Sequence, residues 1–278
     1  MSKVINVTSY GATNVGPVRN NNEDNFFRNE MSYVMMDEDG VMRDKRVGLY
    51  LLCDGMGGHQ KGEVASASAI QELKRLLLGF FLSPEAALFD DFEELLSQAL
   101  KQANDVVYNI NIEEGIPEDA RRMGSTGVAA LYNNGRCYVV HVGDSRCYLV
   151  KGGKIYRLTE DHNYATYLLK SGIFKTREEA ERAHQARALT QALGPYDSST
   201  IQPDVTSFEI DEQACLILCS DGLTDVVSDQ EIAGIASSEH GNPRKMTERL
   251  IKQAYKNGTH DNITVVVARF DIAGKKKR

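Results

Sequence analysis

Apolar residues recur along three stretches at the spacing of an amphipathic helix. The stretches 63–81, 91–113 and 243–256 each carry one apolar stripe, as Leu73 and Leu77 illustrate in the first of them. A stripe of this kind indicates a helix that packs against a core. The sequence therefore predicts two long helices early in the chain and one late.

Between these helices the pattern changes to short apolar runs separated by turn signals. Asn133-Asn134-Gly135 and Gly152-Gly153 each join two such runs, and both are typical of hairpin turns. Hairpins require antiparallel pairing, and long helices beside such strands predict an α+β layered fold. Strands are predicted at 47–53, 126–132, 136–142, 147–151, 154–158, 205–210, 214–219 and 263–270, with a polar, helical stretch at 161–191.

Composition narrows the class of protein. The chain has 278 residues, and its 42% of hydrophobic residues is the value of an ordinary globular protein. Its net charge of −7 argues against general nucleic-acid binding, which requires a basic surface. Its apolar runs are far shorter than the roughly 18 residues that span a bilayer, and the N-terminus lacks the apolar core of a signal peptide. We expect no membrane partner and a cytoplasmic location. The five cysteines include no Cys-x-x-Cys pair and are expected to be small buried side chains.

Four aspartates stand next to strongly apolar strands. Asp54, Asp144 and Asp221 follow such a strand, and Asp261 precedes one. Because the end of one antiparallel strand lies beside the start of its neighbour, all four can gather at one rim of the sheet. Carboxylates crowded against apolar sequence favour a hard cation such as Mg²⁺ or Mn²⁺. For any single aspartate, starting a turn or capping a helix remains an alternative.

Six motifs in this order resemble the metal-dependent protein phosphatases (PPM, or type 2C) in their compact bacterial form. The motifs are VRNNNED at 18–24, DGMGGH at 54–59, GST at 124–126, GDSR at 143–146, SDGLTD at 220–225 and DNIT at 261–264. The resemblance implies an antiparallel β-sandwich between two pairs of helices, a four-layer α-β-β-α arrangement. It also implies a single phosphatase domain over 1–272, followed by a basic tail at 273–278.

The resemblance assigns roles to the acids. Asp54 would bridge two Mn²⁺ or Mg²⁺ ions. One ion would also bind Asp221 and Asp261, and the other would bind the Gly55 carbonyl and waters. Further residues are assigned to metal-bound waters (Glu23 and Asp24), to a third, weaker ion shared with Asp221 (Asp144 and Asp225), and to the substrate phosphate (Arg19).

The implied reaction is hydrolysis of phosphoserine and phosphothreonine in proteins by a water activated between two ions. The implied partners are phosphorylated proteins, including a serine/threonine kinase whose action the enzyme reverses, and we expect a monomer. Two other functions stay open: a phosphoprotein-binding module without catalysis, and another two-metal hydrolase such as a nuclease. The presence of all the matching acids argues against the first, and the acidic balance argues against the second.

One departure concerns the general acid. Eukaryotic members have a histidine directly after the Asp-Gly pair, whereas this chain has Met56 there and His59 later. His59 could reach the leaving oxygen, or it could support the metal ligands from behind. The supporting role is also expected for Asn262 and considered for His260. The other histidines, His141, His162, His184 and His240, show no ligand spacing. The polar stretch 161–193 resembles the family's flap, which suits substrate selection.

Overall fold

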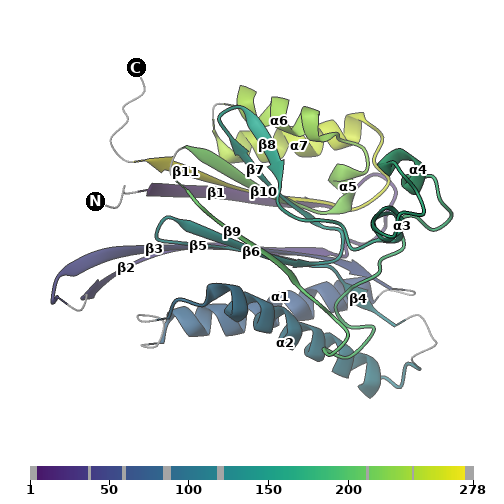
Figure 1. Cartoon of the computed structure of the whole chain (residues 1–278), viewed down its shortest axis with the longest axis horizontal. Coiled ribbons are helices and arrows are strands. Elements are labelled where there is room, and N and C mark those ends of the chain that lie inside the picture. Colours follow the sequence, from purple (N-terminus) through teal and green to yellow (C-terminus); the bar gives the residue numbers. More distant parts are fainter. Residues whose placement is uncertain are drawn as a thin grey trace.

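Two antiparallel sheets stack face to face in the computed structural model, which describes residues 5–36, 39–57, 61–83, 89–117, 122–210, 213–239 and 241–272 (Figure 1). The first sheet has the order β1 (Ile5–Asn14), β11 (Ile263–Ile272), β10 (Ala214–Cys219), β7 (Arg146–Lys151) and β8 (Lys154–Arg157). The second has the order β2 (Asp24–Met36), β3 (Met42–Met56), β5 (Gly127–Asn133), β6 (Arg136–Val142) and β9 (Asp204–Glu209), and the short β4 (Gly124–Ser125) pairs with the end of β3.

Helices cover the outer face of each sheet. The second sheet is covered by α1 (Gly62–Phe81) and α2 (Phe92–Glu113), and the first by α6 (Asp229–Ser238) and α7 (Pro243–Lys256) (Figure 1). The predicted α+β sandwich between helix pairs is therefore confirmed. Among the helices of the described residues, none is both long and apolar enough to cross a membrane.

Local sequence explains where these elements begin and turn. The Asp91 side chain accepts a hydrogen bond from the Glu94 amide at the start of α2, and Asn242 caps α7 in the same way ahead of Pro243. In the β5–β6 hairpin, Asn134 and Gly135 both have positive φ, as a two-residue hairpin turn requires.

Three apolar layers fill the molecule, and each contains cysteine. Cys53 lies between the second sheet and α1 and α2, and Cys137 and Cys147 lie between the two sheets. Cys215 and Cys219 lie between the first sheet and α6 and α7. All five are free and buried, which confirms the expectation from their spacing.

The sequence did not predict β1, β2, β4, α5 (Asp221–Thr224) or α6. Strands β1 and β2 are the outer strands of their sheets, and each carries many polar residues because most of its side chains are exposed or half-buried. Helix α6 is a ten-residue helix with few apolar positions, and it begins at a capping box formed by Ser228 and Glu231.

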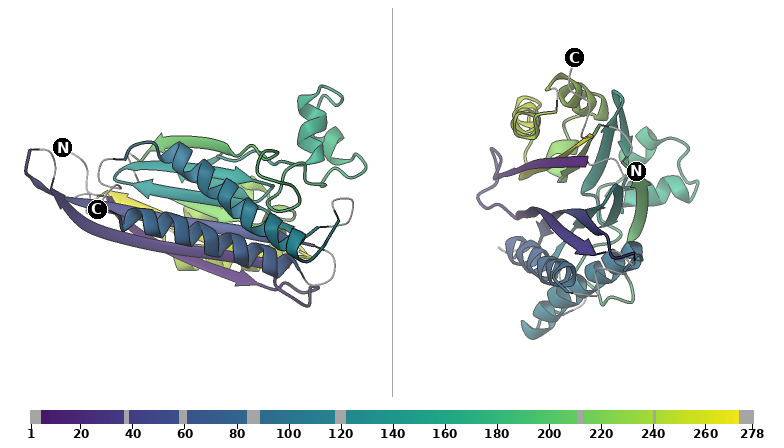
Figure 2. Two further views of the ribbon diagram at one scale, coloured as in Figure 1. Left: turned by 90° about the horizontal axis from the view of Figure 1, so that it is seen from below. Right: turned by 90° about the vertical axis from the view of Figure 1, so that its left-hand side faces the viewer.

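The flap, residues 161–193, stands off from both sheets (Figure 2). It contains α3 (Tyr164–Lys170) and α4 (Arg177–Glu181), so the predicted polar, helical character is confirmed. A small apolar core of its own, formed by Ala165, Leu168, Ala180 and Ala186, packs these helices together. The flap is thus a packed unit attached to the sandwich at its two ends.

Candidate metal centre and active site

Strand pairing brings the predicted acids to one rim of the sandwich. Asp24 and Asp54 lie directly opposite each other on β2 and β3. Asp221 begins α5 (Asp221–Thr224) at the end of β10, and Asp261 precedes β11, the antiparallel neighbour of β10. Asp144 lies in the turn between β6 and β7. This rim is the end of the molecule where α5 and the flap helices lie in Figure 1.

Burial and mutual repulsion both disfavour the charged form of the aspartates at this rim, and burial is the larger cause. Burial, followed by the charges of Asp24, Asp221, Asp144 and Asp261, raises the pKa of Asp54 well above its usual value. Burial and the neighbouring aspartates likewise raise the pKa of Asp221. Like charges placed opposite each other in a sheet destabilise it unless a cation separates them.

Asp24 is the most buried of these acids, with 4% of its surface exposed. Its Oδ2 accepts hydrogen bonds from Ser220 Oγ at 2.8 Å and Thr264 Oγ1 at 2.7 Å. Its Oδ1 is buried without a partner among the described residues. Burial is the main cause that raises the pKa of Asp24 to about 6. An orphaned buried carboxylate oxygen indicates a ligand or water at this position.

Gly55 is the point where three backbone segments meet. Its amide donates to the Glu23 carbonyl at 3.0 Å. A Cβ at Gly55 would lie 2.0 Å from the Gly62 carbonyl oxygen and 2.7 Å from that of Glu23. Only glycine fits here, and this close approach places the Glu23 loop and the start of α1 beside Asp54.

Asn262 fixes the loop that carries Arg19. Its Oδ1 accepts from the Glu23 amide at 2.8 Å, and its Nδ2 donates to the carbonyls of Val15 and Asn21. Arg19 Nη2 in turn donates to Asp261 Oδ2 at 2.6 Å. The Asn262 side chain therefore binds the loop backbone, while its own amide donates to Asp261 Oδ1 at 2.8 Å, and the residue supports the site from behind.

Two further acids extend the rim toward the flap. Asp225 lies one turn beyond Asp221 and is ion-paired with Arg187 of the flap. Burial and the charges of Asp161 and Asp225 raise the pKa of Asp144 to about 7. A simple pairing of Asp144 with Arg146 does not account for its position, because Arg146 Nε and Nη2 both donate to Asp161, at 3.0 and 2.8 Å.

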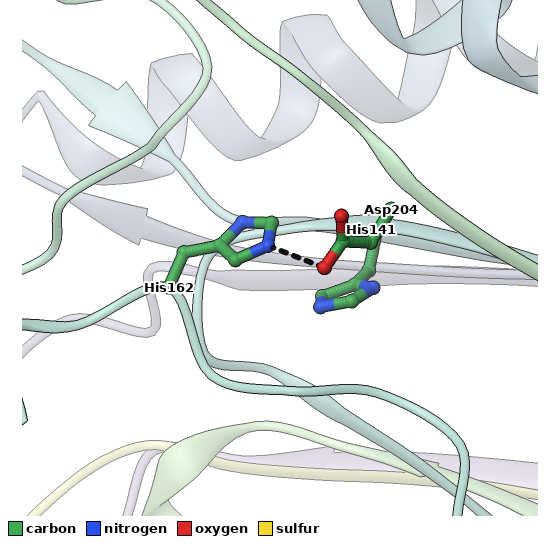
Figure 3. A group of neighbouring side chains, drawn as sticks. All are labelled: His141, His162 and Asp204. Carbon is green, nitrogen blue, oxygen red and sulfur yellow. Dashed lines mark hydrogen bonds and ion pairs between the residues drawn. The ribbon is translucent and has the colours of Figure 1, made fainter. Parts of the chain in front are cut away.

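The structure bears on some of the histidine predictions and not on others. His59 lies outside the described residues, as does the basic tail, and His260 is exposed. The remaining histidines show no ligand spacing in the sequence, yet two of them come together in the structure. One ligand atom each of His141, His162 and Asp204 lie within 4.8 Å of one another (Figure 3). The spacing of 21 residues concealed this cluster, because β6 and the start of the flap bring the two rings together.

Sequence reasoning also missed the hydroxyl groups that surround the acids. Besides Ser220 and Thr264, Thr126 Oγ1 accepts from the Asp54 amide at 3.0 Å. These three residues lie in the GST, SDGLTD and DNIT motifs. The motifs were a usable signal, since small hydroxyl side chains beside aspartates are natural hydrogen-bond donors and acceptors.

The residues at this rim fit hard divalent cations. The available donors are carboxylates and the Gly55 carbonyl, which suit Mg²⁺ and Mn²⁺. Asp54, Asp144 and Asp221 are each partly open to solvent, so an ion can reach them. The orphaned oxygen of Asp24 and the facing charges of Asp24 and Asp54 both point to the same positive partner.

Removal of divalent ions is expected to invert the pH dependence of stability. Without metal, Asp24 and Asp144 have folded pKa values of about 6 and 7 against a usual 3.8, so folding becomes more favourable as pH falls from 8 to 6. With saturating Mn²⁺, protons compete with the ions and stability falls over the same range. Thermal unfolding in EDTA should therefore show a Tm higher by about 3 °C or more at pH 6 than at pH 8. A Tm that falls on acidification in EDTA as it does in Mn²⁺ would contradict this.

Comparison with known proteins agrees with the motifs. The family model for protein phosphatase 2C matches residues 10–263. The chain belongs to the protein phosphatase 2C family. Protein phosphatase PhpP of Streptococcus pneumoniae is 33% identical over 262 residues, covering 93% of this chain and 96% of that protein. Serine/threonine phosphatase stp of Listeria monocytogenes is 31% identical over 268 residues, covering 95% and 96%.

Solved structures of this family superimpose on nearly the whole chain. The Mycobacterium tuberculosis serine/threonine phosphatase PstP/Ppp has a TM-score of 0.77 at 31% identity and covers 96% of this chain and 100% of that one. The catalytic domain of PstP, in complex with two manganese ions, has a TM-score of 0.75 at 30% identity with the same coverage. The family resemblance in the motifs is thus confirmed.

Proposed function

We propose that this phosphatase 2C family member hydrolyses phosphoserine and phosphothreonine in proteins with the help of Mn²⁺ or Mg²⁺, and so reverses the action of a serine/threonine kinase. The observation that carries the proposal is the convergence of Asp24, Asp54, Asp144, Asp221 and Asp261 at one rim with an orphaned buried oxygen among them. A related phosphatase has two manganese ions in its crystal structure, which supports the choice of metal.

Each acid has a place in this proposal. Asp54 would bridge two ions, Asp221 and Asp261 would bind one of them, and the Gly55 carbonyl would bind the other. Glu23 and Asp24 would act through metal-bound waters. Asp144 and Asp225, with Asp221, would bind a third ion more weakly. When bound, the two central ions supply charge neutralisation and lower the pKa of an attacking water.

Arg19 supplies the planar donor group for the phosphoryl oxygens. Its side chain is half exposed, and one guanidinium nitrogen is bonded to Asp261, so the arginine lies directly beside the metal ligands. Asn262 fixes the loop backbone on both sides of Arg19, at Val15 and at Asn21. A bidentate guanidinium on this loop can orient the phosphoryl group for in-line attack.

Phosphate release from phosphothreonine peptides tests the proposal. We expect release that depends on Mn²⁺, is abolished by EDTA and is much faster than release from matched phosphotyrosine peptides. A folded protein that binds the phosphopeptide without hydrolysing it would instead support a binding module. Preference for a phosphodiester would support another two-metal hydrolase. Either result would overturn the proposal.

Replacement of Arg19 should act mainly on substrate binding. We expect Arg19→Ala to raise KM for a phosphopeptide about tenfold or more, and Arg19→Lys to recover only part of the loss, because lysine lacks the bidentate fork. Steady-state kinetics at saturating Mn²⁺ measures both parameters. The matched control is Arg28→Ala, because Arg28 is also a partly exposed arginine but lies further along the chain, on β2. An unchanged KM in Arg19→Ala would rule out the phosphate role.

A further inference from the structure

His162 contacts the Gly143–Asp144 turn through both its backbone amide and its imidazole ring. Its backbone amide donates to the Gly143 carbonyl at 3.0 Å, and the Gly143 amide donates to His162 Nδ1 at 3.2 Å. Both backbone hydrogen-bonding groups of Gly143 are therefore satisfied by a single residue of the flap. Asp144, the next residue, is a proposed ligand of the third ion.

The turn is restrained from the opposite side as well. Gly143 has a φ of +101°, and a Cβ there would lie 2.7 Å from the Thr126 side chain. Thr126 Oγ1 is 2.7 Å from Ser145 Oγ and accepts from the Asp54 amide. Asp144 thus lies between Gly143, which is bonded to His162, and Ser145, which is joined to Asp54 through Thr126.

His162 also joins the two ends of the flap. Its carbonyl accepts a hydrogen bond from the Thr190 amide at 2.9 Å, and the next residue, Asn163, forms a β-bridge with Leu189. The chain that leaves the sandwich and the chain that returns to it therefore meet at His162. Because His162 is also bonded to Gly143, a displacement of the flap would move the Gly143–Asp144 turn as well.

The environment of the imidazole fixes its tautomer. Since Nδ1 accepts from the Gly143 amide, the ring proton is on Nε2, which donates to Asp204 Oδ2 at 3.2 Å (Figure 3). The His141 ring stacks on that of His162 with centroids 4.6 Å apart, and its own Nε2 donates to the Glu160 carbonyl. The His162 ring is thus oriented by three residues: Gly143, Asp204 and His141.

The same tautomer argues against a metal ion in this cluster. The three side chains are close enough to suggest one. However, a metal on His162 Nε2 would displace the proton there while Nδ1 still faces an N–H donor, which would require an imidazolate anion. The cluster is better described as a chain of hydrogen bonds that ends at the Gly143 amide.

We propose that His162 is a positioning residue of the phosphatase reaction, which places the Asp144 carboxylate at the third-ion site and couples that placement to the seating of the flap. The proposal rests on the proposed function, because it requires Asp144 to bind an ion. His162 does not contact substrate. It acts through the geometry of the Gly143–Asp144 turn.

The test combines metal titration with kinetics on three variants. His162→Leu removes the acceptor for the Gly143 amide, whereas asparagine places an oxygen near the position of Nδ1 and glutamine places its polar atoms near Nε2. We expect His162→Leu to weaken the weakest Mn²⁺ site and to lower kcat, each by about tenfold or more, with KM for p-nitrophenyl phosphate unchanged. His162→Asn should recover most of the loss and His162→Gln should not. His184→Leu, at an exposed flap histidine, is the matched control.

A double-mutant cycle separates this role from general stabilisation. If His162 acts through Asp144, His162→Leu should cause little further loss of kcat in an Asp144→Ala background. Undiminished loss in that background, or unaltered Mn²⁺ affinities and kcat in His162→Leu, would overturn the proposal. If His162→Leu does not fold, the comparison of His162→Asn with His162→Gln decides between the two roles. Equal Mn²⁺ affinity and kcat in these two variants would then contradict the proposal. Calorimetric Mn²⁺ titration gives an answer even if the wild-type chain proves inactive on phosphopeptides.

Discussion

Asp54→Asn is expected to lower turnover of p-nitrophenyl phosphate at saturating Mn²⁺ by about a thousandfold, equivalent to about 4 kcal/mol of transition-state stabilisation. Asparagine keeps the size of the side chain but removes the charge that would bridge two ions. Asp54 lies opposite Asp24 in the β2–β3 pair and close to Asp221, Asp144 and Asp261, so it stands at the centre of the acids. Both ions should therefore bind much more weakly.

The same substitution should not harm the fold. In EDTA, Asp54→Asn removes one of several mutually repelling carboxylates, so the variant should unfold at the same temperature as the wild-type protein or higher. Thermal unfolding and Mn²⁺ calorimetry, run beside the kinetics, distinguish loss of metal from loss of structure. Glu209→Gln, at an exposed position of β9, serves as the control. Wild-type turnover in Asp54→Asn would refute the bridging role.

Asp144→Ala is the second substitution with a large expected effect. It should leave two tightly bound ions in place and lower kcat by about a hundredfold, the scale of a lost proton-transfer aid. The third ion would have fewer protein ligands than the central pair, so it should be the weakest to bind. Met56 cannot donate a proton, and an ion at Asp144 could orient a water near the leaving oxygen instead.

Calorimetric titration with Mn²⁺ distinguishes the two classes of site. The wild-type protein should show one weak binding step beyond the tight steps, and Asp144→Ala should lose only the weak one. Asp225→Asn should weaken the same step, because Asp225 contributes to the raised pKa of Asp144 and lies beside Asp221. Full kcat and unaltered stoichiometry in Asp144→Ala would show that a third ion has no role in this chain.

The sequence predicted best those features that depend on local pattern. Helix α7 begins and ends at the predicted residues because Asn242 and Pro243 mark its start and a strong apolar stripe runs along its length. The rim of acids was predictable because antiparallel strands put the end of β10 beside the start of β11. That argument needed only the strand ends and the sign of the charges.

Features that depend on contacts distant in sequence were not predictable. The pairing of Arg19 with Asp261 joins residues 242 positions apart, and Asn262 contacts Val15 across a similar separation. The link from His162 to Gly143 depends on how the flap leaves β8, which no periodicity records. Strands β1 and β2 were missed because outer strands contain too many polar residues to stand out.

The burial of all five cysteines has a consequence for how this phosphatase responds to oxidants. Burial raises the pKa of each thiol, to about 11 at Cys215 and about 12 at Cys219. Peroxide and alkylating reagents react with the thiolate, which is scarce at neutral pH and enclosed between the layers. An oxidative pulse that silences a phosphatase with a cysteine nucleophile would thus leave this chain active, and its thiols would become reactive only when the layers separate.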